Sequence, residues 1–358
     1  MNEQVYKKLC VEMARRGGRY PGKDIPEFYA LAQELFTPEE AAVTAAMTSR
    51  MATAETIAGN MGRDVKEVEA VLEKMADKSL CMSLDKDGMR FYIAVPFVPG
   101  IFEFQFSRGT WTEKDRRIGR LIHAYKEAFN RIHPPEKKAG LSMYRVIPVN
   151  ETIRPQSKVH TFNEINSYID QADPIGVYTC FCRHEAKLLD EKDDCGMPME
   201  VCMVFGVGAR FFIERGVARQ LSKEEAKKVL RTAAEAGLVH AGRNSQELDF
   251  VCNCCACHCM ILKDALSRPK PGKFLSSGYQ PKINPEMCTA CETCIGRCPA
   301  KALTLSGDTP AVDLDRCFGC GVCAVGCPME AIEMVAKENL PIPPANRKEL
   351  EKIIGTKM

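Results

Sequence analysis

The chain has 358 residues, of which 45% are hydrophobic, and its 49 basic and 47 acidic residues leave a net charge of +2. This length is enough for two or three domains with buried cores, and the near-neutral charge gives no overall attraction to nucleic acid or anionic lipid. No apolar run approaches the roughly 20 residues of a membrane-spanning helix, and the sequence start lacks the apolar centre of a secretory signal. We therefore expect a cytoplasmic protein without a membrane span.

Cysteine is the unusual component, because the chain contains 19 and 17 of them lie between Cys180 and Cys327. Disulfide-stabilised scaffolds are short, secreted and even in cysteine number, so this pattern indicates free thiols in a reducing compartment. Free thiols are available to bind metal. The remaining two, Cys10 and Cys81, are expected to be small buried hydrophobic residues.

The first expected unit covers 1–135. Within it, "TPEEAAVTAAM" predicts a helix with Thr37 as N-cap, Pro38 at the first position and Glu40 completing a capping box. "TAETIAGNMG" and "DVKEVEAVLEKMADKSL" predict two more helices, and "LCMSL" and "MRFYIAV" predict a hairpin. Over 37–95 this order of elements resembles the winged helix of many bacterial transcription regulators.

DNA binding is not expected of this unit. The helix that would enter the major groove, "DVKEVEAVLEK", has four acidic residues and two lysines, a net charge of −2 that opposes phosphate contact. A docking or packing role is favoured instead. The next stretch, "PFVPGIFEFQFSRGTW", predicts a buried strand or a partner-facing patch, and "DRRIGRLIHAYKEAFNRIH" predicts an amphipathic helix.

Two similar runs near the carboxyl end, "CTACETCIGRCP" and "CFGCGVCAVGCP", each follow the pattern C-x2-C-x2-C-x3-C-P. Through all eight cysteines, residues 282–336 resemble the bacterial ferredoxin with two [4Fe-4S] clusters. The resemblance implies that the fourth cysteine of each run binds the other cluster. The implied ligands are Cys288, Cys291, Cys294 and Cys327 for the first cluster, and Cys317, Cys320, Cys323 and Cys298 for the second. A pair of zinc sites is the alternative, which this spacing disfavours.

Nine cysteines remain, all in an expected middle unit at 136–265. They are Cys180, Cys182, Cys195 and Cys202, then Cys252, Cys254, Cys255, Cys257 and Cys259. A strand, "PIGVYTC", is predicted before the first group, and a helix with Ser222 as N-cap and Glu225 in its capping box lies between the groups. We expect one or two further [4Fe-4S] clusters here, with one cysteine left over. Structural zinc is the alternative, with His258 or His184 as a nitrogen ligand.

The adjacent Cys254 and Cys255 point in different directions on any regular backbone, so we expect that they do not serve the same cluster equally and that ligation is mixed across the two groups. The step also resembles, weakly, the cysteine-rich repeats of heterodisulfide reductases, which hold a non-cubane cluster around Cys-Cys-Gly. Here Ala256 takes the place of the glycine, and no second copy is present.

The expected architecture is α+β, with a linker at 266–281 and a tail helix at 337–358 that is compatible with docking on the body or on another subunit. No phosphate-binding or dinucleotide-binding glycine motif is present, so no catalytic residue is expected. The main hypothesis is an iron-sulfur protein or subunit of an anaerobic or low-oxygen organism, relaying single electrons to or from a redox enzyme or flavoprotein partner. The alternatives are a redox-sensing winged-helix regulator and an enzyme with a substrate-binding middle cluster.

Overall fold

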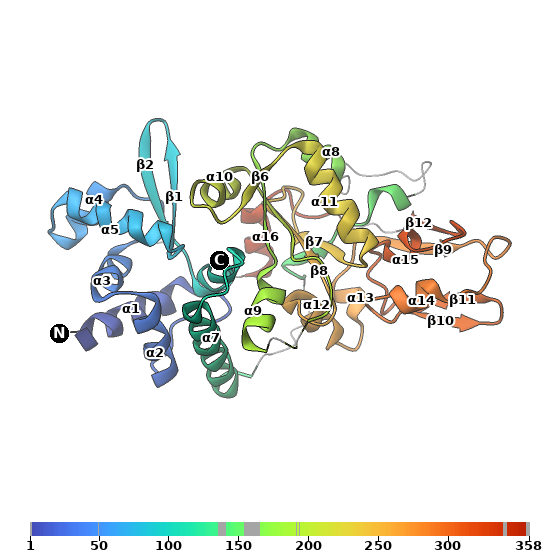
Figure 1. The fold of residues 1–358 in the computed structure, drawn as a ribbon, viewed down its shortest axis with the longest axis horizontal. Coiled ribbons are helices and arrows are strands. Elements are labelled where there is room, and N and C mark those ends of the chain that lie inside the picture. The colour runs from blue at the N-terminus through green and yellow to red at the C-terminus, as the bar shows by residue number, and fades with distance from the viewer. Residues whose placement is uncertain are drawn as a thin grey trace.

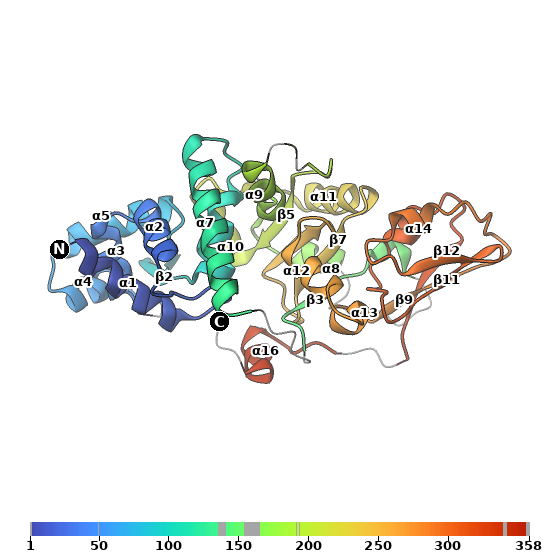
Figure 2. The same cartoon turned by 90° about the horizontal axis from the view of Figure 1, so that it is seen from below.

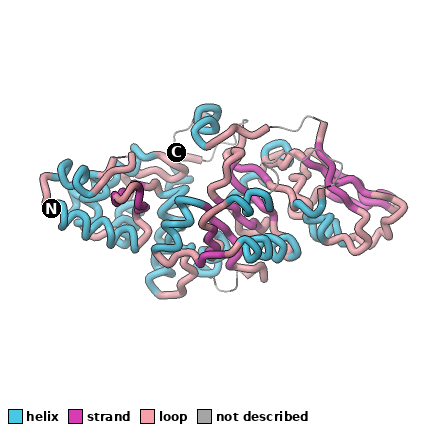
Figure 3. Tube along the Cα trace, turned by 90° about the horizontal axis from the view of Figure 1, so that it is seen from above, coloured by secondary structure: helices cyan, strands magenta, loops and turns pink. Residues whose placement is uncertain are grey.

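The computed structural model describes residues 2–48, 50–134, 141–153, 165–190, 192, 194–338 and 342–355. A helical amino-terminal part, a central sheet flanked by helices and a carboxyl-terminal part with two small two-stranded sheets follow one another along the longest axis (Figure 1). Strands are concentrated in the central and carboxyl-terminal parts (Figure 3). This mixture of helix and sheet agrees with the expected α+β class. In the described ranges no helix has the length and apolarity needed to cross a membrane.

The amino-terminal part follows the predicted order of three helices and a hairpin between 37 and 95. Its Thr37 and Glu40 form the expected reciprocal capping box, and Cys10 and Cys81 are buried as predicted. The elements are α1 (Asn2–Arg16), α2 (Pro26–Leu35), α3 (Pro38–Ala46), α4 (Ala54–Met61), α5 (Val65–Asp77), β1 (Cys81–Lys86) and β2 (Met89–Ala94).

The phenylalanine-rich segment after β2 is not a strand, so that prediction is wrong. It forms an irregular turn, η1 (Phe97–Ile101), and a short helix, α6 (Phe102–Ser107), followed by the predicted amphipathic helix α7 (Glu113–Ile132). The helical turn places Phe102 and Phe106 on one face, and both are buried. The rings of Phe97 and Phe102 stack with their centroids 4.7 Å apart, so this segment contributes to the core rather than to a partner-facing patch.

The central sheet has six antiparallel strands in the order β3-β7-β8-β5-β4-β6. They are β3 (Tyr144–Val146), β4 (Ile175–Thr179), β5 (Glu200–Phe205), β6 (Arg219–Leu221), β7 (Val239–Arg243) and β8 (Phe250–Cys254). Four helices accompany them: α8 (Ile165–Gln171), α9 (Phe181–Leu189), α10 (Gly206–Glu214) and α11 (Lys223–Glu235), the last with the predicted Ser222–Glu225 capping box.

The two faces of this sheet differ. Met203 and Val251 pack in one cluster with residues of α8 and α11. Their neighbours Cys202 and Cys252 belong to the other cluster, which continues into the amino-terminal helices. Because side chains alternate along a strand, β5 and β8 direct cysteines toward the same face.

The carboxyl-terminal part is packed against the sheet rather than joined to it by a loose linker. It comprises α12 (Met260–Leu266), α13 (Pro271–Phe274), β9 (Tyr279–Ile283), α14 (Thr293–Arg297), β10 (Leu303–Ser306), β11 (Thr309–Val312), α15 (Val322–Val325) and β12 (Ile332–Ala336), with the turn η2 (Asn150–Thr152) beside it. The segment expected as a linker, 266–281, includes α13 and the start of β9, and Leu275 and Tyr279 are fully buried. These two buried side chains fix the position of the segment. Its proline and glycine content did not predict this packing.

The tail forms the expected helix, α16 (Arg347–Ile354), on the outside of the molecule (Figure 2). Its Leu350 is buried, and the side chain of Gln246 donates a hydrogen bond to the Pro343 carbonyl at 3.0 Å. The tail therefore docks on the connection between β7 and β8 of the same chain.

Candidate metal centres

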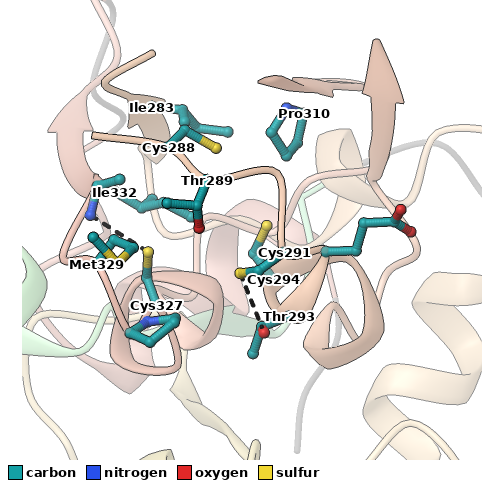
Figure 4. Close-up of a pocket in the computed structure, with 13 residues that line it drawn as sticks. Ile283, Cys288, Thr289, Cys291, Thr293, Cys294, Pro310, Cys327, Met329 and Ile332 are labelled. Atoms are coloured by element: carbon teal, nitrogen blue, oxygen red, sulfur yellow. Dashed lines mark hydrogen bonds between the residues drawn. The ribbon is translucent and has the colours of Figure 1, made fainter. Parts of the chain in front are cut away.

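Four cysteines from the two carboxyl-terminal runs surround one hollow. Cys288 and Cys291 come from the loop that leads into α14, Cys294 lies in α14 itself, and Cys327 comes from the end of the other run. Figure 4 shows Cys288, Cys291, Cys294 and Cys327 around this hollow, with Ile283, Pro310 and Ile332 beside them. The arrangement offers four thiols in an apolar setting.

A second hollow of about the same size is lined by the other four cysteines: Cys298, Cys317, Cys320 and Cys323. Its apolar wall includes Leu303, Phe318 and Met334. In each hollow three cysteines come from one run and the fourth from the other. The structure thus brings together the same two sets of four that the ferredoxin resemblance implied.

The two runs share local geometry. The backbone N–H of Ala302 donates to Cys298 Sγ at 3.3 Å, and that of Ala331 donates to Cys327 Sγ at 3.4 Å. Each acceptor is the crossing cysteine, and each donor lies four residues after it. Such N–H···S bonds stabilise a thiolate and therefore suit a cysteine that binds metal.

Both runs also turn through the left-handed region at equivalent positions. Ala290 has φ 51° in the first run, and its counterpart Gly319 has φ 71° in the second. A Cβ on Gly319 would lie 2.1 Å from the Tyr279 carbonyl oxygen, so close approach to β9 requires glycine there. The first run carries alanine at this position.

The second hollow faces the body of the protein. The backbone N–H of Val149 donates to the Cys320 carbonyl at 3.1 Å, and that of Ser277 donates to the Phe318 carbonyl at 3.0 Å. The first set has the more exposed thiol, because Cys291 is exposed whereas Cys317 is buried. The two sites therefore differ in their access to solvent.

Six of the nine middle cysteines form a second kind of group, which we call the six-thiol ring. Strands β5 and β8 supply three of them, and the starts of α9 and α12 supply the others. All six are buried, and each interacts with two others in a closed circuit. The order around the ring is Cys180, Cys182, Cys259, Cys254, Cys252 and Cys202.

The thiol pKa values alternate around the ring. Hydrogen bonds from ring neighbours lower the pKa of Cys180, Cys252 and Cys259 and raise the pKa of the three thiols between them. Soft thiolates at this density are typical ligands of metals and iron-sulfur clusters.

Arg183 provides a buried positive charge beside the ring. Burial alone would lower the pKa of its guanidinium, but Cys180 and Cys202 outweigh burial and raise that pKa. Its nitrogens also donate to the carbonyls of Asn253 at 3.0 Å and Pro198 at 2.7 Å. This residue was missed in the sequence, although an arginine directly after "CFC" was a signal. It compensates negative charge that the sulfur atoms concentrate here.

The remaining three middle cysteines converge with a histidine. The donor atoms of Cys195, Cys255, Cys257 and His258 all lie within 4.8 Å of one another. Among the residues that the structure describes, no other set of three or more such donors meets that criterion. We call this set the Cys₃His site.

The nine middle cysteines thus divide into six and three. Cys254 and Cys255 join different groups, as their opposite directions predicted. His184, the other histidine considered as a ligand, is not one of the converging donors. Its Nδ1 donates to the Phe106 carbonyl at 2.8 Å, and its ring packs against Trp111 at 4.6 Å between centroids.

Comparison with known proteins bears on the carboxyl-terminal part. Residues 284–338 match the family model described as the LdpA Fe-S cluster-binding domain. A search of curated proteins gave no match. The matched segment contains all eight cysteines that line the two hollows. The carboxyl-terminal part is therefore an iron-sulfur cluster-binding region, and the chain is an iron-sulfur protein.

Proposed function

We propose that this protein transfers single electrons through [4Fe-4S] clusters bound in the two carboxyl-terminal hollows, as a ferredoxin-type unit. The observation that carries the proposal is the exchange of Cys298 and Cys327 between the two sets of four thiols. A bound [4Fe-4S] cluster supplies one-electron chemistry. The chain's own contribution is to hold the thiolates, donate N–H groups to sulfur and surround each site with apolar side chains.

Donor spacing supports clusters rather than single ions in these hollows. A tetrahedral zinc ion with bonds of about 2.3 Å to sulfur needs ligand atoms about 3.8 Å apart. Within the described ranges only the Cys₃His site has three or more donors mutually within 4.8 Å. The cysteines of the two hollows are spread more widely, as thiolates that bind different irons of one cluster must be.

We further propose that the six-thiol ring holds a third iron-sulfur centre. Its six buried thiols exceed the four positions of one tetrahedral ion. Cys259 caps α12, and the chain then reaches Gly272, where a Cβ would lie 2.5 Å from the Cys317 carbonyl oxygen. The ring therefore adjoins, through α12 and α13, the side of the second hollow that faces the body. This order supports an electron relay from the first hollow through the second hollow to the six-thiol ring.

The partner is proposed to be a redox enzyme or flavoprotein that docks at the first hollow. Two exposed apolar side chains support this end: Met329 lines the first hollow, and Met287 directly precedes Cys288. Exposed apolar residues near a redox site favour protein contact over water. Cytoplasmic location and an anaerobic setting belong to the same proposal.

DNA is not the proposed partner, although the 37–95 region resembles a winged helix. Arg215, which follows α10, pairs with Glu73 and Asp77 of α5 at 2.7 Å each. The carboxyl-terminal half of the helix that would read DNA is thus engaged with the central part, and its other charged residues, two lysines and two glutamates, balance each other. We propose that this unit serves docking and packing.

Iron and acid-labile sulfide analysis after strictly anaerobic purification tests the proposal. At four irons per cubane, the two hollows account for about 8 irons, and a cubane in the ring raises the count to about 12. Folded protein without iron would refute the function, and about 8 irons would refute the third centre. Salt-dependent retention on duplex DNA tests the rival regulator, and we expect none.

A further inference from the structure

We propose that Cys195, Cys255, Cys257 and His258 bind one zinc ion, separate from the iron-sulfur clusters. The four donor atoms lie within 4.8 Å of one another, and Cys255 Sγ is 3.8 Å from His258 Nδ1. Tetrahedral zinc with bonds of about 2.3 Å to sulfur and 2.0 Å to nitrogen requires S···N separations of about 3.5 Å. A small inward movement of these side chains therefore completes the coordination shell.

Two short segments present the ligands. The turn between β8 and α12 supplies three of them, and the loop before β5 supplies Cys195. That loop is held independently of any ion, because Gly196 N–H donates to the Asp194 carboxylate at 3.0 Å and Lys187 pairs with the same carboxylate at 2.6 Å. The donors are therefore largely preorganised.

The donor set favours zinc in a structural role. Three thiolates and one imidazole fill all four positions of a tetrahedron, whereas a catalytic zinc keeps one position open. Thiolate and imidazole also suit zinc better than magnesium or calcium, which prefer oxygen. The site lies at the surface, because Cys257 is exposed and Cys195 is half-buried, so a chelator can reach the ion.

The ion would clamp the turn that serves the six-thiol ring. Cys254 and Cys259, which flank the turn, are ring members, and Arg183 interacts with Cys255 as well as with the ring. Loss of the ion would release this turn. The proposed zinc therefore stabilises the ring without taking part in electron transfer.

Metal analysis of the full chain, purified anaerobically, tests the proposal. We expect about one zinc per chain in addition to the iron. The variant His258→Ala should lose at least nine-tenths of the zinc, and His258→Cys should restore it with a fourth thiolate. The control is His123→Ala, because His123 is exposed on α7 and its removal should leave the zinc content unchanged.

A second measurement avoids dependence on folding of the variants. A colorimetric chelator added to native protein should release about one zinc while the iron and sulfide contents stay constant over the same period. Zinc near zero in the purified protein, or full zinc retention in His258→Ala, overturns the proposal. Loss of iron in place of zinc from His258→Ala also overturns it, because the site would then hold iron. The proposed function would fail on a different result, namely that the folded protein contains no iron.

Discussion

The sulfur atoms of Cys254 and Cys259 lie 3.1 Å apart, although three residues between them face a different set of donors. Cys255, Cys257 and His258 converge with Cys195, while the two flanking cysteines close the six-thiol ring. One short turn therefore serves two sites of different geometry. Its conformation couples a single-ion site to a buried group of thiols.

Crosswise ligation predicts a matched pair of variants. Cys327 lies in the second run but lines the first hollow together with Cys291. We therefore expect Cys327→Ser and Cys291→Ser to lose the same electron paramagnetic resonance signal and similar amounts of iron. Cys10→Ala, outside every thiol group, should retain all iron. If Cys327→Ser instead matches Cys320→Ser, each run binds its own cluster and the crosswise assignment is wrong.

The two hollows should differ in oxygen sensitivity. Cys291 of the first hollow is exposed, whereas the four cysteines of the second hollow are buried or half-buried. An apolar shell around a cluster limits solvent access. Exposure to solvent therefore promotes oxidative loss of the cluster. During controlled exposure to air we expect the signal that Cys291→Ser removes to disappear before the one that Cys320→Ser removes. Simultaneous loss would contradict this order.

A substitution at Gly319 should cost more unfolding free energy than the same substitution at Gly307, which has a similar φ. Gly319→Ala adds left-handed strain and a clash with the Tyr279 carbonyl, together about 2–5 kcal/mol of unfolding free energy. Gly307 has φ 63° and no atom within 4 Å of an added Cβ. Gly307→Ala should therefore cost only about 1–2 kcal/mol. Anaerobic thermal unfolding of both variants checks the difference, and equal losses would exclude the clash.

Glu73 should make docking of the amino-terminal part dependent on pH. Burial raises the pKa of Glu73, but hydrogen bonds from Arg90, Tyr92 and Arg215 outweigh it and bring the pKa to about 2. A lowered carboxyl pKa stabilises the folded state above the unfolded value near 4.5, and the stabilisation disappears as pH falls toward 2. Because the side chain is 37% exposed, we expect roughly 1–2 kcal/mol after solvent screening.

The variant Glu73→Gln should therefore be less stable than the wild type above about pH 5, and the difference should shrink below about pH 4.5. Denaturant unfolding followed by fluorescence of Trp111, the one tryptophan of the chain, measures this. Glu69→Gln is the control, because Glu69 is exposed on the same helix. A difference that stays constant below pH 4.5 would show that Glu73 acts through packing alone.

Several features were predictable because they depend on short-range chemistry. The capping boxes at Thr37 and Ser222 involve residues three positions apart, and both are present. The two cysteine runs carry their spacing within twelve residues each. The structure gathers their eight cysteines into the two sets that the family resemblance implied.

The phenylalanine-rich segment shows where such reasoning fails. Its composition suits a strand, but Phe97 and Phe102 stack on each other and lie near Tyr125 of α7. Packing against a helix that begins later in the chain overrides the local preference of these residues. The same applies to 266–281, where buried Leu275 and Tyr279 outweigh the proline and glycine signals.

By itself the sequence determined that the chain is rich in free thiols, that eight of them follow an iron-sulfur pattern, and where most helices begin. Only the tertiary structure decided how the other nine cysteines divide. That division depends on which strands pair, since pairing of β5 with β8 places Cys202 and Cys252 on one face. It depends equally on a turn that directs Cys255 toward Cys195, sixty positions earlier. Side chains far apart in the chain come into contact only when the sheet forms, and the local spacing of the cysteines does not predict these contacts.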